Sequence, residues 1–195
     1  MNRCEKDSID QIRNILSSRV RKVINNLTFA RAAVLVPLYK KGENCHLLFT
    51  KRTDKVKYHK GEISFPGGVF DEEDSELEKT ALREAFEEVG LKEKDVQIIG
   101  VLDDIITLTE FIITPFVGLF PYPYTFKVSE IEIAELIEVP LSFFLREDIY
   151  HERVIFRMNR EEMVDVFQYE NHIIWGATAR ILKQFLDLIS SSKRT

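Results

Sequence analysis

Three glutamates at helical spacing are the residues of this chain best suited to chemistry. At about 100° per residue on a helix, Glu84, Glu87 and Glu88 fall within an arc of about 100°. The opposite side of that helix carries the apolar residues Leu82, Ala85, Phe86 and Val89. Carboxylates this close repel one another, and a hard divalent cation with oxygen ligands is the simplest way to offset the repulsion. Since most glutamate-rich helix faces are solvated surface, the flanking sequence must decide between the two interpretations.

Three flanking features favour a site over plain surface. Arg83 directly precedes the first glutamate, where it could pair with a carboxylate and orient it. Ser75 and Glu78 are spaced as a capping box, and Gly90 suits the residue just past a helix end. Upstream, the motif Phe65–Gly68 ends in paired glycines, which bring backbone close to a ligand. The sequence therefore predicts a short, bounded helix that holds its carboxylates beside a glycine pair.

The segment from Gly68 to Leu91 resembles the Nudix box, the signature of hydrolases that cleave a nucleoside diphosphate linked to another moiety. From Arg83 onward it matches the pattern Arg-Glu-apolar-x-Glu-Glu-x-Gly-apolar at every fixed position. The front is longer by one residue, so the first glutamate of the usual box falls on Ser75. In the family that glutamate usually pairs with the box arginine. Three acidic residues could take its role here: Asp74, Glu76 or Glu78.

A second signature lies directly upstream and resembles that of coenzyme A pyrophosphatases within the Nudix family. The stretch that begins at Leu47 shares these residues with it: Arg52, His59, Gly61, Phe65, Pro66, Gly67 and Gly68. Lys57 stands where the pattern has arginine, so it offers a point charge in place of a bidentate fork. The resemblance implies cleavage of coenzyme A or its derivatives to 3′,5′-ADP and a 4′-phosphopantetheine moiety.

The glutamates and a backbone carbonyl form the expected metal site. We expect Glu84, Glu87 and Glu88 to bind Mg²⁺ or Mn²⁺, with the carbonyl of Gly68, or of Gly67, as a backbone ligand. Such ions polarise phosphoryl oxygens, lower the pKa of a bound water and bridge the leaving group. The expected reaction is therefore the metal-dependent hydrolysis of a pyrophosphate bond.

Family members differ in which glutamate acts as the general base. Glu84, directly after Arg83, is the first choice here for base or ligand, and both residues belong to the expected catalytic set. Glu130 or Glu132 is a distal alternative, although an exposed strand face is the simpler interpretation of that pair.

The substrate phosphates need cationic partners, and the upstream signature supplies them. We expect Arg52, Lys57 and His59 to contact the substrate, together with the backbone of Gly67 and Gly68. For a lone histidine such as His59, a structural role is as common as a role in binding. A basic window precedes the acidic stretch that opens the box and comprises Lys51, Arg52, Lys55, Lys57 and Lys60. A basic wall opposite an acidic, metal-binding wall suits an anionic phosphate substrate.

Two alternatives remain open. One is a Nudix pyrophosphatase for another nucleoside diphosphate derivative, such as ADP-ribose or a dinucleotide. The other is a Nudix module that binds nucleotides without catalysis, against which the intact glutamates argue. Trp175 could stack on an adenine, although one tryptophan at a helix start is more often part of the core.

Hydrophobic spacing predicts helices at both ends of the chain, over about 8–24 and 176–189, with the box helix between them. Apolar runs predict strands at 32–39, 46–52, 96–102, 111–120, 131–139, 149–158 and 163–169. Mixed strands with flanking helices imply an α/β fold, specifically an α/β/α sandwich with a mixed β-sheet. That is also the Nudix fold, and we expect one such domain over 1–195 with its box at about 68–91.

Composition limits the partners. The net charge of −5 argues against broad binding to nucleic acid or to a membrane surface, so a small molecule is the expected partner. The chain opens without the apolar run of a signal peptide, and no stretch approaches a membrane span. Cys4 and Cys45 fit a reduced cytoplasmic setting. The oligomeric state stays open.

Overall fold

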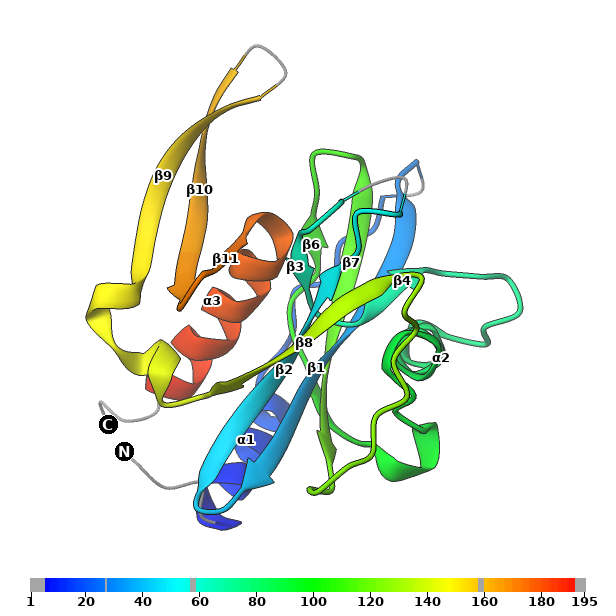
Figure 1. Cartoon of the computed structure of the whole chain (residues 1–195), viewed down its shortest axis with the longest axis vertical. Coiled ribbons are helices and arrows are strands. Elements are labelled where there is room, and N and C mark those ends of the chain that lie inside the picture. The colour runs from blue at the N-terminus through cyan, green and yellow to red at the C-terminus, as the bar shows by residue number, and fades with distance from the viewer. Residues whose placement is uncertain (1–5, 27, 57–58, 158–159, 192–195) are drawn as a thin grey trace.

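The computed structural model of the chain (Figure 1) describes residues 6–26, 28–56, 59–157 and 160–191. Its central element is a mixed sheet with helices on both faces, which confirms the predicted α/β/α sandwich. The strands of this sheet are β1 (Ala30–Lys41), β2 (Asn44–Arg52), β3 (Ile63–Ser64), β4 (Gly67–Val69), β5 (Gln97–Val101), β6 (Ile105–Ile106), β7 (Phe111–Phe120) and β8 (Ile133–Pro140). The helices are α1 (Lys6–Ser18), α2 (Leu77–Val89) and α3 (Gly176–Ser191).

The sheet is mixed because its two longest strands run parallel. β1 pairs with β7 in parallel, whereas its other partners, β2 and β4, are antiparallel to it. The main path of the sheet is β3-β2-β1-β7-β5, with β8 paired to β2 and β6 paired to β7. β4 places Gly68 opposite Ala33 of β1, so the paired glycines lie on the sheet itself.

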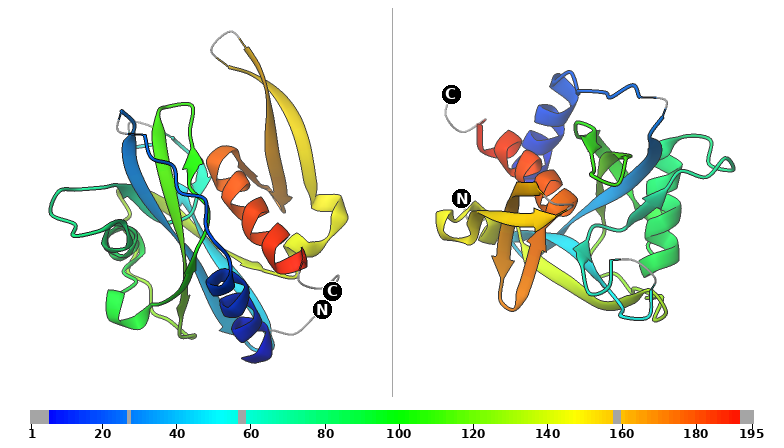
Figure 2. Two further views of the ribbon diagram at one scale, coloured as in Figure 1. Left: turned by 180° about the vertical axis from the view of Figure 1, so that it is seen from behind. Right: turned by 90° about the horizontal axis from the view of Figure 1, so that it is seen from above.

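Alternation along the central strands produces two cores. On β1, Val36 and Leu38 face one side while Ala33 and Leu35 face the other, as expected for a period of two residues. α1 and α3 cover the first face, and α2 covers the second (Figure 2). Both central strands are apolar on each face, as in a sheet covered on both sides.

A second, smaller sheet lies beside α3 (Figure 1). It contains β9 (Tyr150–Arg157), β10 (Arg160–Tyr169) and β11 (His172–Trp175), in the order β11-β10-β9 and antiparallel throughout. The predicted strands at 149–158 and 163–169 are confirmed. Four short strands were not predicted, β3, β4, β6 and β11, because two to four residues are too few to show a period.

The opening helix is shorter than predicted. It ends at Ser18, whereas the apolar spacing suggested a helix to about residue 24. Val20 is 97% exposed, so only the first part of the apolar stripe reaches the core. After the helix the chain is held by two carboxylates. The backbone N–H of Lys22 donates to Asp103, and that of Ile24 donates to Asp104, each at 2.9 Å. These bonds replace the helical ones.

The box helix begins later than the predicted cap. Its N-cap is Glu76, without a side-chain capping bond, so the capping box from Ser75 to Glu78 is wrong. Its end is as predicted. Gly90 adopts φ +73°, the left-handed conformation that glycine adopts without strain, and donates its N–H to the Phe86 carbonyl at 2.9 Å.

Cys45 lies buried on β2 and is disulfide-bonded, so the expectation of a reduced cysteine is wrong at this position. Cys4 lies outside the described residues. Within the described ranges, the helices are all too short or too polar to cross a bilayer.

Candidate active site

The box helix turns two of its three glutamates inward. The exposed fraction of the side chain is 3% for Glu88, 18% for Glu84 and 53% for Glu87. Phe86, predicted to be buried, is 53% exposed instead. The helix buries Ala81, Ala85 and Val89 against the sheet, and this rotation leaves Phe86 outside while it covers Glu88. Two carboxylates one helical turn apart therefore face the sheet.

Gly68 and Glu84 fit each other closely. A Cβ atom at Gly68 would lie 2.3 Å from Oε1 of Glu84 and 2.7 Å from its Oε2, far inside contact distance. Only a glycine at this position leaves room for the carboxylate against β4. The neighbouring Gly67 donates its backbone N–H to the Glu88 carboxylate. The side chains of both inward-facing glutamates therefore lie against the backbone of the paired glycines of β4.

The backbone of Glu88 is hydrogen-bonded, and its carboxyl group is buried among other charged groups. Its backbone carbonyl accepts a hydrogen bond from the N–H of Ser129 at 2.9 Å. Burial of the Glu88 side chain is the main reason that the pKa of its carboxyl group is raised to about 8. The Arg52 cation opposes this rise, and the Glu84 and Glu132 carboxylates add to it. Among the described residues, its Oε2 atom is buried without a hydrogen-bond partner. Burial also raises the pKa of Glu84, against the opposing effect of Arg83.

Arg83 connects the glutamates to the loop before the helix. Its Nη1 atom lies 2.8 Å from Oε1 of Glu84 and 3.2 Å from Oε2 of Glu87. Its Nε and Nη2 atoms donate to the two oxygens of Asp74, at 3.1 and 3.0 Å. Of the three acidic residues considered for the missing box glutamate, Asp74 is therefore the one that pairs with the arginine. It is buried, and the bonds from Arg83 lower its pKa.

We expect Asp74→Asn to lower both stability and turnover. Asparagine keeps the shape but removes the charge, and a hydrogen bond to a charged group contributes about 2 kcal/mol, or about 4–8 °C in Tm for a chain of this length. Arg83 would then bind Glu84 and Glu87 more tightly, and loss of such a supporting partner typically lowers activity about 10–100-fold. Thermal melts and steady-state kinetics test this, with the exposed Asp71→Asn as the control. Wild-type kcat in Asp74→Asn would contradict it.

Arg52 brings the upstream signature to the box. From the end of β2, its Nη1 atom lies 3.5 Å from Oε1 of Glu88, and its Nη2 atom lies 3.7 Å from Oε2 of Glu132. Both distances exceed a good charged hydrogen bond, and the buried Nε atom has no partner among the described residues. N–H groups of the Arg52 guanidinium therefore remain available to bind a ligand. Glu130 is exposed in the preceding turn, so Glu132 is the distal glutamate that lies near the site.

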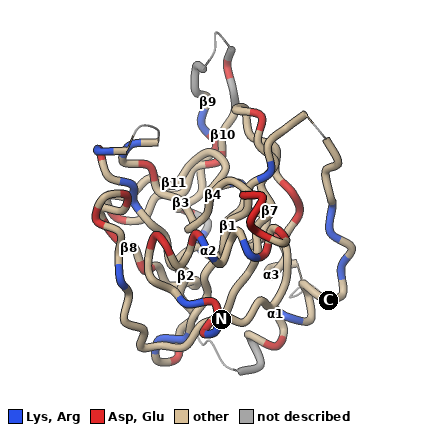
Figure 3. The backbone as a smooth tube through the Cα atoms, turned by 90° about the vertical axis from the view of Figure 1, so that its right-hand side faces the viewer, with Lys and Arg blue, Asp and Glu red and all other residues tan. Residues whose placement is uncertain are grey.

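The loop between β2 and β3 contains the remaining signature residues. His59 is 54% exposed in its side chain, and its Nδ1 atom lies 2.8 Å from Oε2 of Glu62. It has φ +57°, and Gly61 has φ +67° with its N–H donated to the Arg52 carbonyl. These contacts shape the loop that presents Arg52. The lysines described on this loop, Lys55 and Lys60, are exposed, and Lys57 lies outside the described residues. Figure 3 marks the Lys and Arg positions of the described chain in blue and the Asp and Glu positions in red.

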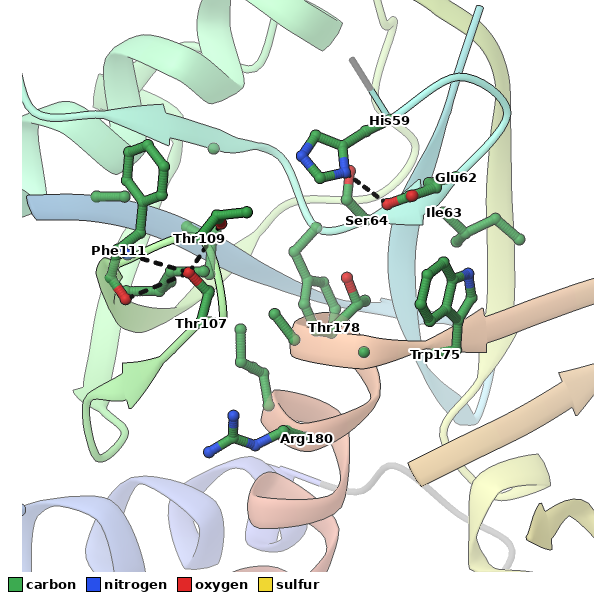
Figure 4. A pocket seen from close by; sticks show the side chains of 18 of the residues that line it. His59, Glu62, Ile63, Ser64, Thr107, Thr109, Phe111, Trp175, Thr178 and Arg180 are labelled. Atoms are coloured by element: carbon green, nitrogen blue, oxygen red, sulfur yellow. Dashed lines mark hydrogen bonds and ion pairs between the residues drawn. The ribbon is translucent and has the colours of Figure 1, made fainter. Parts of the chain in front are cut away.

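A pocket of about 320 Å³ has the paired glycines in its wall, and Figure 4 shows it from close by. Arg52, Gly67 and Gly68 belong to its lining. The other walls come from the turn after β6, from β10 and β11, and from the start of α3. They include Thr107, Leu108, Met163, Trp175, Thr178 and Arg180. Apart from Trp175, these residues were not predicted as site residues, because three segments distant along the chain must fold together to form the wall.

The donor groups beside α2 fit a hard divalent cation. Carboxylate oxygens are the ligands that Mg²⁺ and Mn²⁺ prefer, and the unpartnered Glu88 Oε2 is a free donor of this kind. Arg83 also pairs with Asp74. Its guanidinium would therefore stay paired if Glu84 and Glu87 turned toward a metal ion. In the part of the chain that the structure describes, no group of three His, Cys, Asp or Glu side chains is already arranged to hold a metal. Carboxylates of a suitable kind are present, but their oxygens do not converge on one point in the described structure.

Comparison with known proteins agrees with this geometry. The NUDIX domain model matches residues 28–138. The chain is 40% identical over 164 residues to an uncharacterized Nudix hydrolase, NudL, from Enterobacter sp. (strain 638), covering 84% of this chain and 83% of that protein. It is 38% identical over 167 residues to the protein of the same name from Citrobacter koseri, covering 85% and 86%.

Solved structures share the fold at low sequence identity. An Ap4A hydrolase from C. elegans, solved as a binary complex, has a TM-score of 0.50 and 17% identity, covering 60% of this chain and 83% of that one. A MutT/nudix family protein from Enterococcus faecalis has a TM-score of 0.52 and 12% identity, covering 96% and 75%. With the matched domain and the NudL relatives, the identity is established: this chain belongs to the Nudix hydrolase family.

Proposed function

We propose that this Nudix hydrolase cleaves the diphosphate of coenzyme A or its derivatives, giving 3′,5′-ADP and a 4′-phosphopantetheine moiety. The observation that carries the proposal is the contact between Arg52 and Glu88, 3.5 Å between Nη1 and Oε1. Arg52 belongs to the signature that resembles coenzyme A pyrophosphatases, and Glu88 belongs to the Nudix box. Since Arg52 both lines the pocket and contacts the box glutamate, it links the substrate signature to the residues expected to carry the chemistry.

The acidic residues supply the metal site in this proposal. Glu84, Glu87 and Glu88 would hold Mg²⁺ or Mn²⁺, with the backbone carbonyl of Gly68 as a further ligand. When bound, the ion would polarise the phosphoryl oxygens and lower the pKa of a bound water. Arg83 keeps Glu84 and Glu87 in place through its pairing with Asp74.

The remaining groups orient the substrate and move a proton. The Arg52 guanidinium, which lines the pocket, donates to a phosphoryl oxygen, where it stabilises charge that grows as phosphorus is attacked. Glu84, half-buried beside the β4 backbone, accepts the proton of the attacking water. His59 lines the pocket, and because its Nδ1 atom is bonded to Glu62, its Nε2 atom is the ring nitrogen that contacts the substrate in this proposal.

A panel of diphosphates tests the proposal. We expect coenzyme A to be cleaved with the highest kcat/KM, compared with ADP-ribose and diadenosine polyphosphates, in the presence of Mg²⁺ or Mn²⁺. Mass spectrometry should identify 3′,5′-ADP and 4′-phosphopantetheine as products, and a chelator should abolish the reaction. Faster cleavage of ADP-ribose than of coenzyme A would assign the site to a different Nudix substrate.

A further inference from the structure

A buried hydroxyl group follows Arg52 in the chain. Thr53 is 6% exposed, and its Oγ1 atom donates to the backbone carbonyl of Ile131 at 2.7 Å. Its backbone N–H donates to the carbonyl of Glu132 at 2.8 Å. A single threonine directly after β2 therefore binds two consecutive carbonyls of the segment that leads into β8.

The pairing of β2 with β8 is irregular at the same place. Lys51 lies opposite Glu135. The next residue, Arg52, lies opposite Ile133, so β8 has one residue more than β2 at this point. A bulge of this kind bends its strand and changes the direction of a side chain, and bulges are common beside active sites. The two bonds from Thr53 continue the attachment past the bulge, and they therefore help to set how far the bent strand stands from Arg52.

The segment before β8 is a turn that also contacts the box helix. The N–H groups of Glu132 and Ile133 donate to the carbonyl of Ser129 at 3.0 and 2.8 Å. The N–H of Ser129 in turn donates to the backbone carbonyl of Glu88 at 2.9 Å. The 129–133 turn is therefore fixed to α2 on one side and to the residue after β2 on the other, which limits the freedom of its backbone.

Glu132 is the carboxylate that this turn presents to Arg52. Its Oε2 atom lies 3.7 Å from the Nη2 atom of Arg52, and Oε1 of Glu88 lies 3.5 Å from Nη1. The guanidinium thus lies between two carboxylates without a close bond to either. In the proposed function Glu88 belongs to the metal ligands. Of these two carboxylates, Glu132 is then the one left to orient Arg52, and its position depends on the turn.

We propose that Thr53 is a positioning residue. Its hydroxyl fixes the 129–133 turn, so that Glu132 holds the Arg52 guanidinium toward the substrate phosphate. Thr53 itself is not among the described residues that line the pocket, so it acts through Arg52 and does not touch the substrate. The inference rests on the proposed function, and it assigns Glu132 to the orientation of Arg52 rather than to proton transfer.

Thr53→Val tests the role of the hydroxyl, because valine keeps the shape of threonine and removes the donor. We expect kcat/KM for coenzyme A to fall about 10–100-fold, the loss that a small misplacement of a binding group can cause. Thr53→Ser keeps the donor and should keep most of the activity. Thr50→Val is the matched control, since Thr50 is buried on β2 and its hydroxyl donates to the Ser64 carbonyl at 3.2 Å. If Thr53→Val were as active as Thr50→Val, the proposal would be wrong.

A double-mutant cycle separates positioning from a general structural role. In an Arg52→Ala background, Thr53→Val and Glu132→Gln should each have little further effect on kcat/KM, because both act through the missing guanidinium. Losses that multiply would show that they act independently of Arg52 and would overturn the proposal. The Glu132 side chain is 46% exposed, so Glu132→Gln should fold and give a result even if Thr53→Val does not.

The design keeps this inference separate from the proposed function. The cycle uses the compound of the diphosphate panel that is cleaved fastest. If that compound is ADP-ribose, the coenzyme A assignment fails, while the cycle still decides the role of Thr53. The dissociation constant of the same compound in EDTA is a second readout without turnover. It should rise in Thr53→Val and Arg52→Ala but not in Thr50→Val. If no compound is cleaved or bound, the function and the inference fail together.

Discussion

Glu88→Gln should lower kcat by about 10²–10⁴-fold, the usual contribution of a metal ligand or general base, without lowering the melting temperature. Glu88 is the most buried of the three glutamates, and its Oε2 atom has no partner in the described structure. Burial raises its pKa to about 8, which means that the folded protein disfavours its charge. A neutral glutamine of the same shape removes this penalty and keeps an oxygen for the Gly67 N–H. Stability should therefore stay the same or rise.

The comparison that decides this prediction is between activity and stability in the same samples. Glu78→Gln, on the first turn of the same helix, is the matched control and should retain both. If Glu88→Gln keeps more than about a third of the wild-type kcat, Glu88 is not part of the catalytic machinery. A large drop in melting temperature would show that Arg52 needs the negative charge for folding, since that ion pair is lost in the variant.

Gly68→Ala should lower kcat by about 10–100-fold, in the range seen when groups that orient a ligand are changed. The new Cβ atom would stand 2.3–2.7 Å from the carboxylate of Glu84. Since that carboxylate ends a flexible side chain, it can rotate away at little energetic expense, and the pairing of Gly68 with Ala33 is retained. The substitution should thus displace a proposed ligand and base while the melting temperature changes by only a few degrees.

Gly118→Ala is a useful contrast for this variant. Its Cβ would meet Leu35 and Val96 at 2.7 Å, inside the core and away from the glutamates. We expect it to lose stability and keep its kcat, the opposite of Gly68→Ala. If Gly68→Ala retained full activity, the position of the Glu84 carboxylate would not matter for the reaction.

The sequence singled out the candidate site residues, but it did not predict correctly where their side chains point. The box pattern identified Arg83 and its three glutamates, because their spacing is local and helical. It did not show that Glu88 is buried and Phe86 exposed, since this depends on how α2 rotates against the sheet. Both residues border the apolar stripe of the helix, so only the packing of α2 decides which of them is covered.

Tertiary contacts account for the other differences. Asp74 could not be chosen over Glu76 and Glu78 from spacing alone, because a turn returns it toward Arg83: its N–H donates to the Asp71 carbonyl at 2.9 Å. The opening helix was overestimated for a similar reason. Asp103, distant along the chain, binds the backbone that follows Ser18, and no local pattern encodes such a partner.

The position of the small sheet has a consequence for how such an enzyme can change. Every residue of the pocket wall on β10, β11 and α3 lies beyond residue 138, where the match to the NUDIX domain ends. The pocket is therefore shared between two stretches of the chain, because Arg52, Gly68 and Leu108 lie inside the matched domain. Substitutions of lining residues on β10, β11 or α3 would alter one wall of the pocket and leave the glutamates of α2 in place. The buried positions of the same elements are not free to vary in this way, since Phe167, Ile174 and Phe185 belong to the core of the main sheet.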